Sequence, residues 1–363
     1  MTIYVGSLKF SPVFKSHCCA FGKACEKEGH DVRYLFSQEY EWMLPAEVKE
    51  KTVFVGDSVG IGSMIVDGLN VKNKQKLAAI FKDRPQAIYL HNYHFLNNYV
   101  AKLSKKNGCR FIYHVHEPYV ANKKAHGGFH QYWLYIFEHW QGKLLQNTDV
   151  AVVSSEFASF LFEKRYLDFS GKKLLVPLMF EDLGDSEIEP DDRKFVTFVG
   201  PPVPAKNPEK FLDIVDRARQ KHLNLNFLLI SKSQIKDSKY FGKDNLQIFF
   251  EEQTSDEDFG RWIKKSFSVL APYKRETQSS VILVSYMYGT PVITSDVGGL
   301  PEFVCDDETG FSLSLDAGTD EWLERICCAQ QNFLYMSKNC RKYFVDNFSG
   351  ENWKNFLDDL LGD

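Results

Sequence analysis

The chain has 363 residues, more than one hydrophobic core usually supports, so two domains are expected. Hydrophobic residues make up 44% and aromatic residues 15% of the chain, which excludes a mainly disordered protein. The formal net charge is −4 without long basic runs, which disfavours nucleic acid as a partner, because binding to phosphates needs concentrated positive charge.

Short apolar runs alternate with helical patterns through the first half of the chain. A first strand is predicted at 2–5, and the helix that follows it ends at Gly29. Further strands are predicted at 32–36, 52–55, 87–90, 110–115, 150–153 and 173–176, and helices near 11–28, 74–83, 94–107, 129–146 and 155–167. This alternation is typical of right-handed βαβ units around a parallel sheet.

An acidic stretch then interrupts the pattern. Seven of the twelve residues from Glu181 to Asp192 are Asp or Glu, and Gly184 and Pro190 lie among them. Such a stretch is unsuited to a hydrophobic core and is typical of a linker between domains. The sequence therefore predicts an N-terminal domain over 1–178 and a linker over 179–194.

The alternation restarts after the linker and predicts a second domain over 195–345, followed by a C-terminal helix over 346–363 that is expected to cross back to the N-terminal domain. Strands are predicted at 195–199, 226–230, 246–249, 268–271 and 291–294, and helices at 207–221, 256–265, 279–288 and 318–340. Two doubly wound α/β halves with a cleft between them are therefore expected. In such sheets, ligands bind beyond the carboxyl ends of the strands.

Targeting and cofactor signals are weak. The first residues lack the charged start and long apolar run of a signal peptide, and no apolar run approaches the roughly 20 residues that span a bilayer. None of the eight cysteines has the spacing of a zinc or thioredoxin-like site. We expect a cytoplasmic protein with reduced thiols, either soluble or peripheral to the membrane.

The second half contains the most informative motif. It runs from Ala271-Pro-Tyr-Lys-Arg-Glu276 through Gly289-Thr-Pro-Val292 to Gly298-Gly-Leu-Pro-Glu302, and Gly310 follows. This order and spacing resembles the donor-binding core of the retaining GT-B glycosyltransferases of family four. The resemblance implies two Rossmann-like domains and an enzyme that takes a sugar from a nucleoside diphosphate. In that family the glutamate at the position of Glu276 binds the donor sugar.

Physical chemistry supports a donor site at this motif. The free N–H groups at a helix start can bind a diphosphate, and the predicted helix begins near Ser279. Lys206, after Gly200 and before a predicted helix, matches the family's donor-phosphate lysine, and an anionic ligand would offset its unfavourable place at a helix N-terminus. The expected donor-binding residues are Gly200, Lys206, Lys274, Arg275, Glu276, Thr277, Gln278, Ser279 and Ser280.

Three positions depart from the family pattern. Pro201 replaces an arginine, Val284 replaces the glutamate that binds the ribose, and residues 8–12 lack the usual pair of glycines. Each lost charged hydrogen bond costs about 1.5–3 kcal/mol. Lys274, Arg275 or Lys232 could replace the missing cation, and Ser280 could bind a hydroxyl.

Histidines mark the predicted acceptor side of the first half. The strand at 110–115 leads into His116-Glu117-Pro118, which resembles the family's strand ending in His-Asp. His114 and His116 alternate along the strand and so share a face. The predicted acceptor residues are His114, His116 and Glu117, and the predicted catalytic residues are His116, Lys206 and Glu276. His91 and His94 form a weaker pair after the strand at 87–90.

Aromatic residues crowd the predicted helix at 129–146, at positions 129, 132, 133, 135, 137 and 140. Packing against the sheet is one interpretation. A hydrophobic acceptor groove or a contact with a membrane surface is the other.

The leading hypothesis is transfer of a sugar from a nucleoside-diphosphate sugar to a hydroxyl of a glycan, a lipid-linked acceptor or a small molecule. The resemblance implies retention of configuration and no metal or other cofactor. The alternative is a catalytically silent GT-B subunit that binds a glycan or a partner protein, and a GT-B sugar epimerase is a third interpretation.

Overall fold

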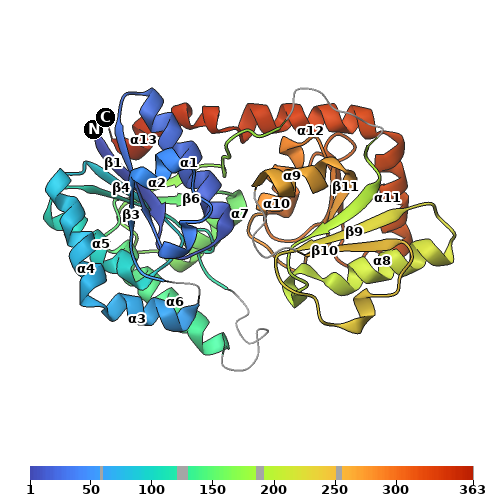
Figure 1. Ribbon diagram of the computed structural model, residues 1–363, viewed down its shortest axis with the longest axis horizontal. Coiled ribbons are helices and arrows are strands. Elements are labelled where there is room, and N and C mark those ends of the chain that lie inside the picture. Colours follow the sequence, from blue (N-terminus) through green and yellow to red (C-terminus); the bar gives the residue numbers. More distant parts are fainter. Residues whose placement is uncertain (58–59, 121–129, 185–191, 251–255, 363) are drawn as a thin grey trace. The chain divides into compact units, whose positions relative to one another are not determined.

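The computed structural model describes residues 1–57, 60–120, 130–184, 192–250 and 256–362. The chain forms two compact units, Met1–Glu181 with Gly350–Asp363, and Asp182–Ser349. Each unit contains one parallel sheet with helices packed against it (Figure 1). The predicted α/β fold with two Rossmann-like domains is confirmed.

The first unit contains a seven-stranded sheet in the order β3-β2-β1-β4-β5-β6-β7. Its strands are β1 (Thr2–Ser7), β2 (Asp31–Phe36), β3 (Thr52–Phe54), β4 (Ala87–His91), β5 (Arg110–His114), β6 (Val150–Val153) and β7 (Lys172–Leu175). Its helices before the linker are α1 (Pro12–Lys27), α2 (Ala46–Glu50), α3 (Ile61–Leu69), α4 (Val71–Ala79), α5 (Phe95–Lys106), α6 (His130–Leu145) and α7 (Glu156–Arg165).

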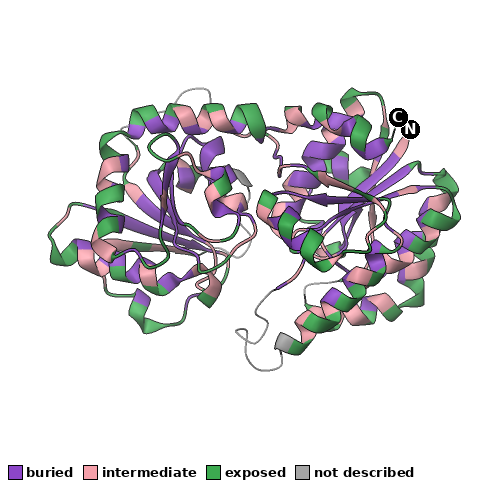
Figure 2. Ribbon diagram, turned by 180° about the vertical axis from the view of Figure 1, so that it is seen from behind, coloured by how far each residue is buried: buried purple, intermediate pink, exposed green. Residues whose placement is uncertain are grey.

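Alternate residues of the strands supply two cores, one on each face of this sheet. Ile3 and Val5 of β1 face a core shared with α1, whereas Tyr4 faces the core shared with α4 to α7. Figure 2 shows the resulting pattern, with buried strands and helices whose outer faces are exposed. The inner strands β1, β4, β5 and β6 are buried on both faces, which explains their largely apolar sequences.

The second unit contains a six-stranded sheet in the order β10-β9-β8-β11-β12-β13. Its strands are β8 (Phe195–Val199), β9 (Asn226–Ser231), β10 (Leu246–Phe250), β11 (Ser266–Ala271), β12 (Val292–Ser295) and β13 (Gly310–Leu313). Its α-helices are α8 (Pro208–Gln220), α9 (Asp256–Lys264), α10 (Ser280–Met287), α11 (Thr319–Gln331) and α12 (Phe333–Asn347).

The C-terminal segment belongs to the first unit. It consists of the 3-10 helix η7 (Gly350–Asn355) and α13 (Leu357–Leu361). Trp353 is 1% exposed and packs edge-on against Phe21 of α1, with ring centres 5.1 Å apart. The first unit is therefore built from two separate stretches of the chain.

Some predicted elements differ from the observed ones. The predicted helix at 318–340 is wrong as a single element, because it divides at Asn332, whose side-chain amide donates to the carbonyl of Cys328 at 3.0 Å and caps α11. Helix α3 was not predicted, because Gly62 and Gly68 weaken the helical pattern. Of the predicted linker at 179–194, residues 185–191 lie outside the described residues, as does Phe129.

Among the described helices, none is long and apolar enough to cross a membrane.

Candidate functional site

In the second unit, the direction of chain winding reverses between β8 and β11. From β8 the chain proceeds outward to β9 and β10, whereas β11 lies on its other side and leads to β12 and β13. In open α/β sheets, ligands bind at the carboxyl edge where the order reverses. The loops after Val199 and Ala271 therefore form the candidate donor edge.

Lys206 is fixed at this edge by three local features. Its ammonium donates to the carbonyl of Val199 at 3.2 Å and lies 5.1 Å from the centre of the Tyr273 ring. Gly200 has a φ of 109°, and a Cβ there would lie 2.4 Å from the lysine Nζ. Glycine thus allows the strand end and the ammonium to approach closely.

The loop after β11 is tied to the loop that carries Lys206. The N–H of Lys274 donates to the carbonyl of Ala205 at 2.8 Å. The carbonyl of Glu276 accepts from the N–H of Gly299 at 3.2 Å, which connects the same loop to the Gly-Gly motif. Three sequence-distant motifs are therefore brought together at one edge of the sheet.

The remaining predicted donor residues lead into α10. Lys274 and Arg275 are exposed, Glu276 and Thr277 are half-buried, and Gln278 and Ser279 are buried. Ser280 is the first residue of α10, whose initial N–H groups lack partners within the helix. The arrangement provides cations, one carboxylate and a helix start over a short stretch of chain.

The structure also locates the residues that depart from the family pattern and a possible substitute for the missing cation. Pro201 follows Gly200 in the loop after β8, and Lys232 directly follows β9, where it is half-buried. Val284 lies one helical turn after Ser280 and is half-buried. A longer polar side chain at Val284 would therefore have partial access to solvent.

In the first unit the winding reverses between β1 and β4, which places Lys9 at the corresponding edge. The Lys9 carbonyl accepts from the hydroxyl groups of Ser7 at 2.7 Å and Tyr40 at 3.0 Å, which fixes its backbone. Burial lowers the pKa of Lys9, and the nearby charge of Glu117 partly opposes this shift. Sequence reasoning missed Lys9, although its position just after the first strand was the available signal.

Histidines form a cluster beside this edge. The rings of His114 and His116 stack with centres 4.2 Å apart, as their alternation on the strand predicted. His91 Nδ1 lies 3.2 Å from His116 Nε2, within hydrogen-bonding distance. The ring of His17, from α1, stacks on His91 at 6.0 Å.

His114, predicted on the acceptor side, is buried and has two hydroxyl partners. It is 1% exposed, and its Nδ1 and Nε2 lie 2.7 Å from the Tyr89 hydroxyl and 2.6 Å from the Ser154 hydroxyl. Both ring nitrogens of His114 have hydroxyl partners, so its ring is held in place and stacks against the ring of His116. His116 itself is half-buried, and Glu117 is exposed.

The histidines of this cluster are neutral at pH 7. Burial lowers the pKa of His91, His114 and His116 well below the usual value for histidine, and the neighbouring histidines, together with Lys9 beside His116, lower each further. Burial likewise lowers the pKa of His17 to about 4. A neutral imidazole can donate one hydrogen bond and accept another.

The cluster also has the composition of a metal site, since His91, His114 and His116 offer nitrogens within 4.8 Å of one another. A metal would have to displace one of the two hydroxyl partners of His114. The described contacts therefore fit a hydrogen-bonded network.

His94, the other predicted histidine of this region, has a structural role. Its Nδ1 accepts from the N–H of Leu96 at 3.0 Å and so caps the first turn of α5. This contact is a typical side-chain cap at a helix N-terminus.

Comparison with known proteins identifies the class. The model of Glycosyltransferase Family 4 matches residues 15–169, and that of Glycosyl transferases group 1 matches residues 193–332. With two Rossmann-like units of this topology, the chain is a glycosyltransferase of the GT-B type. It belongs to the group 1 family of these enzymes. Among curated protein sequences, none matches the chain.

Solved structures of glycosyltransferases share the fold along the whole chain. Sucrose-phosphate synthase from Thermosynechococcus elongatus is 15% identical, with a TM-score of 0.72 over 98% of this chain and 96% of that one. Anabaena Alr3699/HepE in complex with UDP and glucose is 13% identical, with a TM-score of 0.71 over 100% of both chains. WaaG, a glycosyltransferase involved in lipopolysaccharide biosynthesis, is 14% identical, with a TM-score of 0.68 over 100% of both. At such identities the similarity establishes the fold alone.

Proposed function

We propose that the enzyme transfers a sugar from a nucleoside-diphosphate sugar to a hydroxyl group of an acceptor, with retention of configuration and without a metal ion. The observation that supports this most directly is the fixed ammonium of Lys206 at the winding reversal of the second unit, hydrogen-bonded to the Val199 carbonyl. The HepE structures in complex with UDP and with UDP-glucose support the donor class.

The donor is assigned to the second unit. Lys206 and the start of α10 would bind the diphosphate, because an ammonium and free helix N–H groups both stabilise negative charge. Lys274 and Arg275, which are exposed on the connecting loop, would supply the cation that Pro201 cannot. The carboxylate of Glu276 would accept hydrogen bonds from sugar hydroxyls.

The positive groups also support the absence of a metal from the reaction. As the bond between the anomeric carbon and the diphosphate oxygen breaks, negative charge develops on the diphosphate. Lys206, Lys274 and Arg275 would stabilise this charge, which is the role that a divalent cation has in other phosphate chemistry. The acceptor oxygen bonds to the anomeric carbon, and the hydroxyl proton leaves with the diphosphate.

The acceptor is assigned to the first unit, at the edge that carries Lys9 and His116. A neutral His116, supported by His114 and hydrogen-bonded to His91, would orient a hydroxyl by accepting or donating a hydrogen bond. Glu117 is exposed beside it and would contact the acceptor. The class of acceptor is a glycan, a lipid-linked molecule or a small molecule with a free hydroxyl.

The test is a panel of UDP-, GDP- and ADP-sugars, with release of the nucleoside diphosphate as the readout. We expect release from at least one donor, undiminished by EDTA, and a product of the donor's anomeric configuration in an NMR spectrum. Release from no donor would contradict the donor class. Loss of activity in EDTA, restored by a divalent cation, would contradict the metal-independent reaction.

A further inference from the structure

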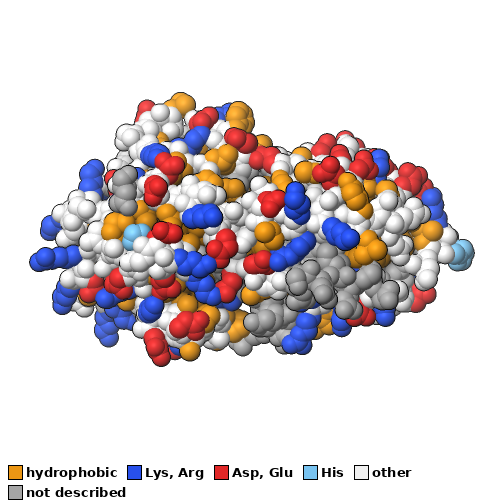
Figure 3. All heavy atoms as spheres, turned by 90° about the horizontal axis from the view of Figure 1, so that it is seen from above, with side chains coloured by type: hydrophobic (Ala, Val, Ile, Leu, Met, Phe, Trp, Pro, Cys, Tyr) orange, Lys and Arg blue, Asp and Glu red, His pale blue; other side chains and the backbone are white. Residues whose placement is uncertain are grey.

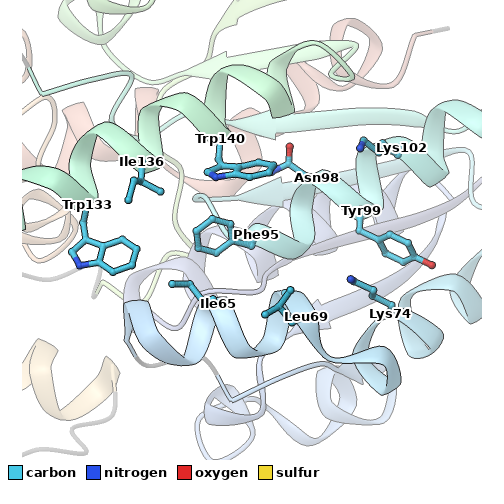
Figure 4. A pocket seen from close by; sticks show the side chains of 11 residues that line it. Ile65, Leu69, Lys74, Phe95, Asn98, Tyr99, Lys102, Trp133, Ile136 and Trp140 are labelled. Carbon is cyan, nitrogen blue, oxygen red and sulfur yellow. The ribbon is translucent and has the colours of Figure 1, made fainter.

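The first unit has an apolar groove on the face of its sheet opposite α1. It lies between α3, α5 and α6 and has a volume of about 470 Å³. Figure 4 shows the side chains that line it, which come from these three helices and, at Lys74, from α4. Those that matter here are Ile65, Leu69, Phe95, Trp133, Ile136 and Trp140.

Aromatic packing shapes this groove in advance. The ring of Phe95 stacks on Phe137 with centres 5.9 Å apart and meets Trp140 edge-on at 6.2 Å. The Lys143 ammonium lies 4.3 Å from the centre of the Trp140 ring. A tryptophan beside a lysine is well suited to a boundary between water and an apolar phase.

Apolar side chains in the groove and next to it in the sequence are exposed. Leu69 and Val71, on either side of Asn70 at the junction of α3 and α4, are 72% and 65% exposed. On α6, Tyr132 and Ile136 are 59% and 39% exposed. Contiguous exposed apolar side chains of this size usually mark a site of interaction.

The charged side chains exposed on the four helices around this groove have one sign. Helices α3, α4, α5 and α6 contain seven lysines, whereas their acidic residues are Asp67 and Glu138. Both carboxylates are buried: Asp67 accepts from the Asn73 amide at 2.9 Å, and Glu138 from the N–H of Val120 at 3.0 Å. Among the described side chains of these helices, every exposed charged side chain is therefore a lysine.

This distribution is unlike that of the chain as a whole, whose net charge is −4. On the face in Figure 3, basic and acidic side chains are interspersed. Exposed apolar groups ringed by lysines complement a bilayer that contains anionic lipids, because the apolar groups enter the headgroup region and the ammonium groups meet the phosphates.

We propose that the surface formed by α3, α4, α5 and α6, here called the lysine-apolar surface, docks the enzyme on an anionic bilayer. Leu69, Ile136 and Trp140 would insert, and the lysines of α4 and α5 would contact lipid headgroups. The proposal is independent of the transfer reaction, since it concerns binding to lipid without donor or acceptor.

The first test is co-sedimentation of the full chain with vesicles. Wild-type enzyme should bind vesicles that contain phosphatidylglycerol at least tenfold more tightly than vesicles of phosphatidylcholine alone. Binding should weaken in 0.5 M salt, because the Debye length then falls to a few ångströms. Equal binding to both kinds of vesicle, or none to either, would overturn the proposal.

Matched variants localise the contact. Lys72→Glu with Lys102→Glu should reduce binding at least tenfold, whereas Lys338→Glu with Lys354→Glu changes the net charge equally and should leave it unchanged. All four lysines are exposed, so the fold should tolerate each substitution. Equal loss in the two double variants would show a general charge effect and overturn the assignment.

The apolar contribution and the rival occupants are tested separately. Leu69→Ser with Ile136→Ser should reduce the binding that persists in 0.5 M salt. Binding of a short-chain lipid monomer without binding to vesicles would indicate a single-lipid site and overturn the bilayer proposal. Self-association in light scattering that these two serine substitutions abolish, without vesicle binding, would assign the surface to a second copy of the chain.

Discussion

The Lys206 ammonium lies 5.1 Å from the centre of the Tyr273 ring, and this contact joins the loop after β8 to the loop after β11. An ammonium over an aromatic face is stabilised by the ring's negative potential. Lys206 is therefore held at the winding reversal of the second unit before any ligand arrives. A preorganised cation loses little side-chain entropy when it binds an anion.

The first prediction follows from this contact. Lys206→Ala should weaken binding of the nucleoside diphosphate by about 1.5–3 kcal/mol, as for other hydrogen bonds to charged groups. Lys206→Arg is not expected to restore it, because a planar guanidinium cannot keep the close approach to Gly200. Isothermal titration calorimetry with UDP measures the effect.

Lys338→Ala, at an exposed position of α12, is the matched control for the loss of one charge. If UDP binds with equal affinity to the Lys206 variant and to this control, Lys206 is not part of the donor site.

The second prediction concerns Glu276. Glu276→Gln removes the charge but keeps the size, so binding of sugar-free UDP should stay nearly intact. The turnover number should fall about 10- to 150-fold, the equivalent of a charged hydrogen bond of about 1.5–3 kcal/mol. The comparison requires calorimetry with UDP and release of UDP from the sugar donor. Unchanged turnover would refute the assignment of Glu276.

The third prediction is a pH dependence of stability in the first unit. Burial lowers the pKa of His17, His91 and His114, so the folded state binds fewer protons than the unfolded state below a pH of about 6.5. Their stabilising effect is present above that pH and is lost as the pH falls toward 4. Each can reduce the free energy of unfolding by up to about 1.4 kcal/mol per pH unit.

Urea unfolding at pH 5 and pH 7 measures this slope. His91→Phe removes one titrating group and should make the slope shallower. Identical slopes in wild type and His91→Phe would contradict a buried neutral His91.

The fourth prediction addresses the C-terminal segment. Trp353 is almost fully buried against Phe21 and Tyr89, so Trp353→Ala should destabilise the first unit by about 3–5 kcal/mol. Hydrogen exchange resolved by segment should show faster exchange in α1 and β4. Protection in the second unit, for example in β11, should not change. Equal loss of protection in both units would contradict a local role for Trp353.

Much of the fold could be predicted from the sequence, because most strands of the two sheets are short apolar runs between helical patterns, although β13 (Gly310–Leu313) was not predicted. The strand ends that lead to Lys206 and His116 follow from the order of these elements, whereas the winding reversals depend on the order of the strands within each sheet. The break at Asn332 could not be predicted with the same ease, because it depends on one side-chain amide and not on a glycine or proline.

Site residues that belong to a sequence motif could be predicted. Contacts between residues far apart in the chain could not. Lys206 and Glu276 belong to loops that a motif marks in the sequence. The two ring nitrogens of His114 pair with the hydroxyl groups of Tyr89 and Ser154, which lie 25 and 40 residues away in the chain. Its place on the strand predicted the stacking with His116 but could not reveal those two hydroxyl partners.

The division of the first unit into two stretches of chain has a consequence for folding during synthesis. The second unit, Asp182–Ser349, is complete on the ribosome before the segment after Gly350 has been made. Until then, the side of α1 that packs on Trp353 stays uncovered. The hydrogen bond from the N–H of Gly350 to the carbonyl of Phe180 cannot form either. Domains generally fold as units as they emerge. The part of the enzyme that is synthesised first is therefore the part whose core closes last.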